Sequence, residues 1–231
     1  KEVPVPEIGR NEVLIKVEAS ALCRSDVDVC EWTELVDRAG YALPFIMGHE
    51  FSGTIVKTGE DVQGFREGDR VAGETHIPCG YCETCRTGNQ HICGNHMGVL
   101  GRTVDGCFAE YIALHEKALI RLPDNVSFEE GAILEPFATA MHAVSKANPS
   151  GKSLLIAGVG TIGQMAVEIA KFLGCTKLFA VDINDYKLEE TKKRGADIVI
   201  NGTKEDLVEI VKRETYGYGV DAVIDFTGSQ Y

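Results

Sequence analysis

The amino-acid sequence predicts an α/β protein with a β-rich first part and a second part built on a parallel sheet. Short apolar runs alternate with period two up to about residue 122, and the apolar period becomes helical near Ser127. From Gly151 onward, strand-like and helix-like segments follow each other in turn. The chain has 231 residues, 44% of them hydrophobic and 25% charged, which suits one large or two modest globular domains.

Strands are expected in the first part wherever β-branched and apolar residues alternate between turn residues. Four runs have this pattern: 13–17, 52–56, 69–72 and 109–114. The sequence Ser127-Phe128-Glu129-Glu130 has the form of a capping box, in which a serine and a glutamate three residues later satisfy each other's backbone N–H groups. A linking helix is therefore expected from Glu129 to about Lys146.

The second part repeats a strand followed by a helix. Strands are expected at 153–157, 178–183, 198–200 and 222–226, with helices at 162–173, 186–194 and 205–214. Such helices are the usual crossovers between parallel strands. We therefore expect domains at 1–146 and 147–231. Four strands are fewer than a complete doubly wound dinucleotide-binding sheet contains, so further residues are expected beyond Tyr231.

A Gly-x-Gly-x-x-Gly pattern begins at Gly158, directly after an apolar strand, and opens a helix. Gly158 allows a tight turn, Gly160 lets a pyrophosphate approach the backbone, and Gly163 lets the helix pack closely on the sheet. Asp182 closes the next strand and can accept hydrogen bonds from an adenosine ribose. Its charge would repel a 2′-phosphate, which favours NAD over NADP. The positive charge of Lys187, five residues later, makes that preference moderate. A purely structural glycine turn is the alternative.

Four of the eight cysteines lie within fifteen residues: Cys79, Cys82, Cys85 and Cys93. These spacings let one loop surround a tetrahedral ion, and zinc with four thiolates is a closed, structural site. An iron–sulfur cluster is the main alternative, but nothing else in the sequence indicates electron transfer. Free thiols are a third interpretation.

A second group of candidate ligands comes from three separate segments: Cys23, His49, Glu50 and Glu135. Each has an ordinary structural explanation, because a single cysteine is often a small buried side chain and a charged pair often lies on the surface. Their spacing in the sequence does not show that they meet.

The segment from Gly48 to Val62 resembles the G-H-E-x2-G-x5-G-x2-V signature of zinc-containing medium-chain alcohol dehydrogenases. The four-cysteine segment and the glycine pattern stand where that family has them, so the resemblance covers essentially the whole chain. It implies a GroES-like β-rich catalytic domain followed by a partial Rossmann sheet, which is doubly wound and parallel.

The resemblance also implies a catalytic zinc ion held by Cys23, His49 and Glu50, besides the structural zinc ion. Glu135 would be an exchanging ligand or a hydrogen-bond partner of the zinc-bound water. NAD would be contacted by three residues of the second part: Ile162, Asp182 and Lys187.

The reaction implied by the resemblance is oxidation of a small secondary alcohol, with hydride transfer to NAD. The family pattern C-x-T-D-x-H carries the alcohol's proton away through a hydroxyl and then a histidine. Here Ser25 keeps the hydroxyl, and Asp28 stands where the histidine would be. A carboxylic acid suits a proton relay at neutral pH less well than an imidazole does. Ser25, Asp28 and Glu135 are the candidate catalytic residues.

Within the family, the stretches 73–79, 106–111 and 135–137 are most similar to those of L-threonine 3-dehydrogenases, which form 2-amino-3-oxobutanoate. Sorbitol and butanediol dehydrogenases are close alternatives, and the substitution at Asp28 mildly favours such a polyol or diol substrate. A non-catalytic zinc- and nucleotide-binding module is a third interpretation. His76 is a weak candidate for contact with the polar end of a substrate.

Charge and hydropathy argue against two classes of partner. The chain has 23 basic and 35 acidic residues, a net charge of -12, and no basic face, so no nucleic-acid partner is expected. No apolar run approaches the roughly 20 residues of a membrane span, so no membrane partner is expected either. The first residues lack the features of a secretory signal, which predicts a cytoplasmic protein. The resemblance implies a homo-oligomer, commonly a tetramer.

Overall fold

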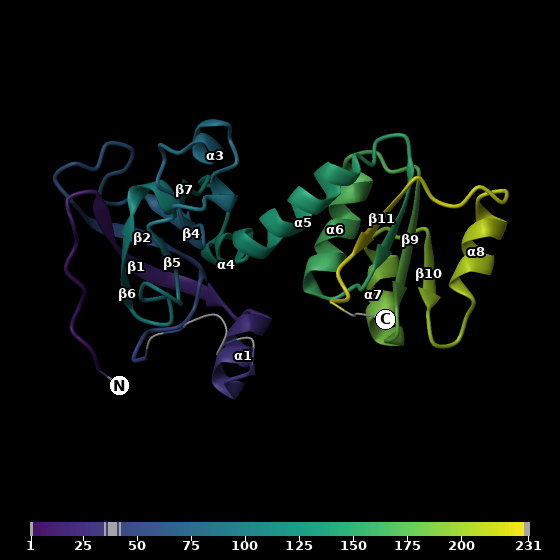
Figure 1. Cartoon of the computed structure of the whole chain (residues 1–231), viewed down its shortest axis with the longest axis horizontal. Coiled ribbons are helices and arrows are strands. Elements are labelled where there is room, and N and C mark those ends of the chain that lie inside the picture. Colours follow the sequence, from purple (N-terminus) through teal and green to yellow (C-terminus); the bar gives the residue numbers. More distant parts are fainter. Residues whose placement is uncertain (1, 35, 37–40, 42, 229–231) are drawn as a thin grey trace. The chain divides into compact units, whose positions relative to one another are not determined.

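The computed structural model describes residues 2–34, 36, 41 and 43–228, and the chain divides into the units Lys1–Glu135 and Pro136–Tyr231. Strands dominate the first unit, and strands alternate with helices in the second (Figure 1). The predicted α/β class is therefore confirmed. The division falls near the start of α5 (Leu134–Ala147), and the domain boundary expected after residue 146 stays a prediction.

The larger sheet of the first unit is antiparallel, with the strand order β6-β1-β2-β3-β7. Its strands are β1 (Glu12–Ala21), β2 (Glu50–Thr58), β3 (Arg70–Gly73), β6 (Tyr111–His115) and β7 (Leu119–Arg121). Alternate side chains face the core, as the period-two pattern predicts, and Val13, Ile15 and Ile55 are fully buried there. The short strand β7 was not predicted, because three residues are too few to show a period.

The pairing of β1 with β2 fixes which chain segments meet at one end of the sheet. Ala21, the last residue of β1, lies opposite Glu50, the first residue of β2. The helix α1 (Arg24–Glu31) begins directly after β1, with Cys23 as its N-cap. Cys23 therefore comes to lie beside the start of β2, far from it in sequence.

The four-cysteine segment lies between the strands of a small hairpin. Strand β4 (His76–Ile77) pairs with β5 (Gly98–Val99), and the intervening chain forms α3 (Glu83–Arg86) and the 3-10 helix η1 (Gln90–Ile92). A further 3-10 helix, η2 (Glu116–Ala118), joins β6 to β7. These elements are too short for a periodic signal in the sequence.

The prediction of a single linking helix from Glu129 to about Lys146 is wrong, because the structure has two helices there. They are α4 (Phe128–Ala132) and α5 (Leu134–Ala147), separated at Ile133. Pro136 has no N–H to donate to the carbonyl of Ala132, so it interrupts a continuous helix but fits the first turn of a new one. The capping box at Ser127 is confirmed, since its hydroxyl accepts from the Glu130 N–H at 3.1 Å.

The second unit contains the predicted parallel sheet, in the order β10-β9-β8-β11. Its strands are β8 (Ser153–Ala157), β9 (Lys177–Asp182), β10 (Ile198–Asn201) and β11 (Ala222–Asp225), and its crossover helices are α6 (Thr161–Phe172), α7 (Asp185–Lys193) and α8 (Leu207–Glu214). Both faces of the sheet are buried, because Leu154 and Leu155 belong to hydrophobic clusters on opposite sides. The carboxyl ends of β8 and β9 lie at the same edge.

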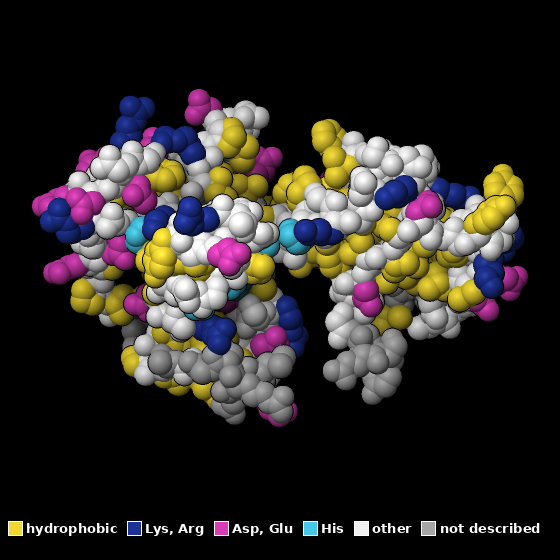
Figure 2. Space-filling model, turned by 45° about the horizontal axis from the view of Figure 1, so that its top comes forward, with side chains coloured by type: hydrophobic (Ala, Val, Ile, Leu, Met, Phe, Trp, Pro, Cys, Tyr) yellow, Lys and Arg dark blue, Asp and Glu magenta, His cyan; other side chains and the backbone are white. Residues whose placement is uncertain are grey.

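Two surface properties bear on partners. Among the described residues, no helix has both the length and the apolar character that crossing a membrane requires. On the face shown in Figure 2, lysine and arginine side chains are interspersed with aspartate and glutamate rather than gathered in one patch.

Candidate metal centre and cofactor site

Three of the candidate ligands meet beside the end of β1. One ligand atom each from Cys23, His49 and Glu50 lies within 4.8 Å of the other two. Gly48 directly precedes two of these ligands. Its φ is +92°, and a Cβ there would lie 2.5 Å from the ring of Phe108, so glycine is the residue that fits this backbone turn. The glycine in the pattern Gly-His-Glu therefore allows a backbone turn after which His49 and Glu50 lie next to Cys23.

The charges of these side chains depend on one another. The hydrogen bond between Cys23 and His49 lowers the pKa of the Cys23 thiol and raises the pKa of the imidazole. Glu50 is only 5% exposed, and this burial is the main reason why the pKa of its carboxyl is raised. The nearby negative charge of Glu135 raises this pKa further. A half-buried thiol and imidazole and a buried carboxylate, with a second carboxylate close by, form a site that a divalent cation would neutralise.

Asp26 belongs to this site although it was not among the predicted residues. Its Oδ2 accepts the Cys23 N–H at 2.9 Å, and its Oδ1 faces His49 Nδ1 at 3.6 Å. A carboxylate at Nδ1 favours the proton on that nitrogen and leaves Nε2 as the ligating atom. The spacing of Cys23 and Asp26 is that of a helix N-cap and its N3 residue, a signal that was used at Ser127 but not here.

A cavity of about 200 Å³ lies beside two residues of this site, Asp26 and His49. Its lining includes Ser25, His49, Thr75, His76 and Glu135. The Thr75 hydroxyl donates to Glu135 Oε1 at 3.0 Å, and Glu135 is not among the three residues whose ligand atoms converge. Thr75 thus orients Glu135 in the cavity. No motif marks Thr75, because its importance depends on a residue sixty positions away.

The two residues of the expected proton relay both lie on α1. Ser25 lines the cavity, whereas Asp28 is not among the lining residues. Asp28 lies one turn further along α1 and pairs with Arg24, with the Arg24 Nη2 2.9 Å from its Oδ1.

The four clustered cysteines form a second group of converging ligands. Sulfur–sulfur distances are 3.9 Å for Cys79 and Cys85, 3.8 Å for Cys82 and Cys93, and 3.6 Å for Cys79 and Cys93. Four sulfurs at the zinc–thiolate distance of about 2.3 Å from one ion stand about 3.8 Å apart. A polynuclear iron–sulfur cluster would place the thiolates on different iron atoms and therefore further apart.

The surroundings of Cys79 favour its thiolate form, whereas burial is the largest cause that raises the pKa of the Cys85 thiol to about 12. Burial raises the pKa of the Cys79 thiol, but hydrogen bonds from the backbone of Tyr81 and Cys82 and from neighbouring thiols outweigh it and lower the pKa to about 6. Lys117 Nζ donates to the Cys79 carbonyl at 2.8 Å and so ties this segment to the end of the sheet.

The glycine pattern forms the turn between β8 and α6. Gly158 has a φ of +82°, and a Cβ on Gly163 would lie 2.1 Å from the Gly158 carbonyl oxygen, so the chain itself requires both glycines. A Cβ on Gly160 would meet no protein atom within 4 Å. The absence of a side chain at Gly160 keeps open a space at the N-terminus of α6, as a bound pyrophosphate requires.

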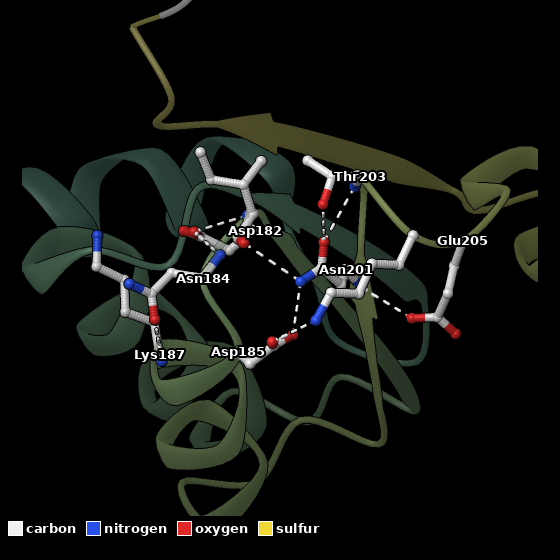
Figure 3. A network of polar contacts seen from close by, with 9 residues as sticks. Asp182, Asn184, Asp185, Lys187, Asn201, Thr203 and Glu205 are labelled. Carbon is white, nitrogen blue, oxygen red and sulfur yellow. Dashed lines mark hydrogen bonds and ion pairs between the residues drawn. The ribbon is translucent and has the colours of Figure 1, made fainter.

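Asp182 lies beside this turn. Its Oδ2 accepts the Val159 N–H at 2.9 Å, and its Oδ1 accepts the N–H groups of Ile183 and Asn184 at 2.8 and 3.0 Å. Figure 3 shows Asp182 at the end of β9, with Asn184 and Lys187 following it into α7. Ile162, the remaining predicted cofactor residue, lies half-buried in the first turn of α6.

Comparison with known proteins shows which family the chain resembles. A family model described as the alcohol dehydrogenase GroES-like domain matches residues 9–124, and one described as zinc-binding dehydrogenase matches residues 161–231. The L-threonine 3-dehydrogenase of Caldanaerobacter subterraneus subsp. tengcongensis is 44% identical over 97% of this chain and 64% of its own length.

Solved structures of dehydrogenases are similar to this chain along nearly its whole length. Galactitol-1-phosphate dehydrogenase from Escherichia coli superposes with a TM-score of 0.87 and 32% identity, over 99% of this chain and 65% of its own. An alcohol dehydrogenase from Escherichia coli CFT073, solved in complex with NADH, has a TM-score of 0.87 and 30% identity, over 97% of this chain and 64% of its own. The chain spans just under two thirds of the length of these three proteins. It belongs to the zinc-containing medium-chain alcohol dehydrogenase family.

Proposed function

We propose that the protein is a zinc-dependent oxidoreductase that transfers hydride from a secondary alcohol to NAD, with L-threonine as substrate and 2-amino-3-oxobutanoate as product. The observation that carries the proposal is the convergence of Cys23, His49 and Glu50 beside a cavity. Support for the substrate comes from four relatives named L-threonine 3-dehydrogenase, at 38–44% identity.

The three converging side chains fit a catalytic zinc ion. A sulfur, a nitrogen and an oxygen ligand leave one tetrahedral position open, as catalytic zinc sites require. When bound there, zinc would polarise the substrate hydroxyl and lower its pKa. Cys23, His49 and Glu50 hold the ion, and Asp26 orients the imidazole. Glu135, held by Thr75, provides a hydrogen-bond acceptor in the cavity and serves as partner of the metal-bound water or as an exchanging ligand.

We assign the remaining roles to the four clustered cysteines and to the residues around the glycine turn. Cys79, Cys82, Cys85 and Cys93 hold a structural zinc ion that shapes the hairpin beside the cavity. In the second unit, Gly158, Gly160 and Gly163 receive the pyrophosphate of NAD. Ile162 and Lys187 contact the cofactor, and Asp182 accepts from its adenosine ribose. By family resemblance we further propose that the protein is a cytoplasmic homotetramer.

A polyol or diol is the second candidate substrate. It is favoured by the similarity to galactitol-1-phosphate dehydrogenase and by the aspartate at position 28, where the threonine enzymes carry a histidine. The cavity lining has hydrogen-bonding groups that suit either substrate, namely Ser25, Thr75 and His76.

Turnover by the full-length, zinc-loaded protein tests the proposed function. With NAD at a fixed concentration, NADH formation is followed with L-threonine, sorbitol and 2,3-butanediol in parallel. We expect the highest kcat/KM with L-threonine. A higher kcat/KM with sorbitol or butanediol would assign the protein to the polyol group. Absence of turnover with all three, in protein that still binds zinc and NADH, would favour the non-catalytic module.

Alanine substitutions at Gly160 and at Gly163 distinguish the contribution of this turn to cofactor binding from its contribution to packing. Gly160→Ala should raise the KM for NAD and cost at most about 1 kcal/mol of stability, because its Cβ enters open space at a helix N-cap. Gly163→Ala should cost about 1–3 kcal/mol, because its Cβ meets the backbone of Gly158. The measurements are urea unfolding and NAD titration. An unchanged KM for NAD in Gly160→Ala would contradict a pyrophosphate at this turn.

Substitutions at Ser25 and Asp28 test the proton relay. Ser25→Ala should lower kcat about 100-fold and leave the KM for NAD unchanged, because it removes the hydroxyl in the cavity. Asp28→Asn should lower kcat much less, since Asp28 is paired with Arg24 outside the cavity. Steady-state kinetics across roughly pH 6 to 9, a range that includes the unperturbed imidazole pKa of about 6.5, provide the comparison. Equal losses in the two variants would establish Asp28 as the second relay residue.

A further inference from the structure

The last residue of β10, Asn201, is buried, with 4% of its surface exposed, and each polar atom of its side chain is engaged. Its Nδ2 donates to the Ile183 carbonyl at 3.2 Å and to Asp185 Oδ1 at 2.6 Å. Its Oδ1 accepts from the Thr203 N–H at 3.0 Å and from the Thr203 hydroxyl at 2.7 Å. A primary amide donates two hydrogen bonds and accepts two, so Asn201 is saturated (Figure 3).

These bonds join two loops at the carboxyl edge of the sheet. Asn201 lies opposite Asp182 in the parallel pairing of β10 with β9. The residues that its Nδ2 holds, Ile183 and Asp185, form the turn that follows Asp182 and leads into α7. The turn after β9 is thereby fixed from the side of β10, while the Val159 N–H fixes Asp182 from the side of β8.

The turn has a second attachment to the same loop. Lys204 Nζ pairs with Asp185 Oδ2, and the hydrogen bonds from Lys204 and Asn201 lower the pKa of Asp185. The Gly202 N–H donates to the Asp182 carbonyl at 3.1 Å, and Glu205 Oε2 accepts the Asn201 N–H at 2.9 Å. Asp185 therefore stays ionised as the acceptor for Asn201. The two loops form one hydrogen-bonded unit around the end of β9.

A buried amide is costly unless it is fully bonded, and a fully bonded one specifies geometry more strictly than an apolar side chain does. We propose that Asn201 is a positioning residue for the adenosine end of NAD. It holds the turn 183–185 so that the carboxylate of Asp182 faces the ribose hydroxyls of the cofactor. This inference rests on the proposed function, because it assumes that Asp182 receives a dinucleotide.

Two variants of the full-length protein test the role of Asn201. Asn201→Ala removes all four side-chain bonds. Asn201→Asp keeps the acceptor for Thr203 but replaces the donor to Asp185 with a second carboxylate oxygen, which repels it. For each variant, we expect the Kd of ADP-ribose, measured by calorimetry, to rise about tenfold, which corresponds to about 1.4 kcal/mol. The KM for NAD should rise similarly, while kcat and the KM for the alcohol stay within about twofold.

A matched control lies at the opposite end of the same two strands. Asp197, just before β10, accepts the Leu178 N–H at 2.7 Å and pairs with Lys171 at 3.1 Å. Asp197→Ala removes a more exposed polar bridge between β9 and β10 that does not contact the turn 183–185. We expect its unfolding midpoint to fall and its Kd for ADP-ribose to match that of the wild type.

An exchange of the two partners checks that their contact is responsible. In the double variant Asn201→Asp with Asp185→Asn, an amide at 185 can donate to a carboxylate at 201, so part of the lost ADP-ribose affinity should return. Wild-type affinity in both single variants, or equal weakening in Asp197→Ala, would overturn the inference and leave the proposed function intact. Failure of the wild type to bind ADP-ribose would overturn the proposed function as well.

Discussion

The pairing of β1 with β2 is the constraint on which the candidate active site depends. With Ala21 opposite Glu50, the chain leaving β1 reaches Cys23 beside the residues that open β2, and so a thiol, an imidazole and a carboxylate meet. A shift of one residue would turn alternate side chains to the opposite face of the sheet and separate these ligands. Close contact of the strands supports the register, since a Cβ on Gly53 would lie 2.2 Å from the Lys16 carbonyl.

The second unit uses strand pairing in the same way, with parallel strands. The carboxyl ends of β8, β9 and β10 bring the glycine turn, Asp182 and Asn201 to one edge of the sheet. Hydrogen bonds then connect the three strand ends, from Val159 to Asp182 and from Asn201 to the turn after Asp182. Such an edge of an open α/β sheet is where ligands of this fold class bind. In both units, strand register places the functional groups and local hydrogen bonds orient them.

Features encoded within a short stretch were predictable from the sequence. The four cysteines converge as their spacing indicated, and the glycine turn and the capping box at Ser127 have the expected form. Features that depend on distant residues were not predictable. Examples are Thr75 holding Glu135 and Asp26 facing His49, because each needs the tertiary fold to bring its partner near. The division between α4 and α5 was missed because the helical period continues through Pro136, whose missing N–H breaks the helix.

Zinc content of the full-length protein and two variants tests the central claim, that two separate ligand groups each hold one ion. We expect about two zinc ions per chain in the wild type and about one in either His49→Ala or Cys93→Ser. The ion remaining in His49→Ala should be the one resistant to chelators, because four thiolates enclose it, whereas a site with an open position exchanges readily. A wild type with a single ion, unchanged in His49→Ala, would contradict a metal centre at Cys23, His49 and Glu50.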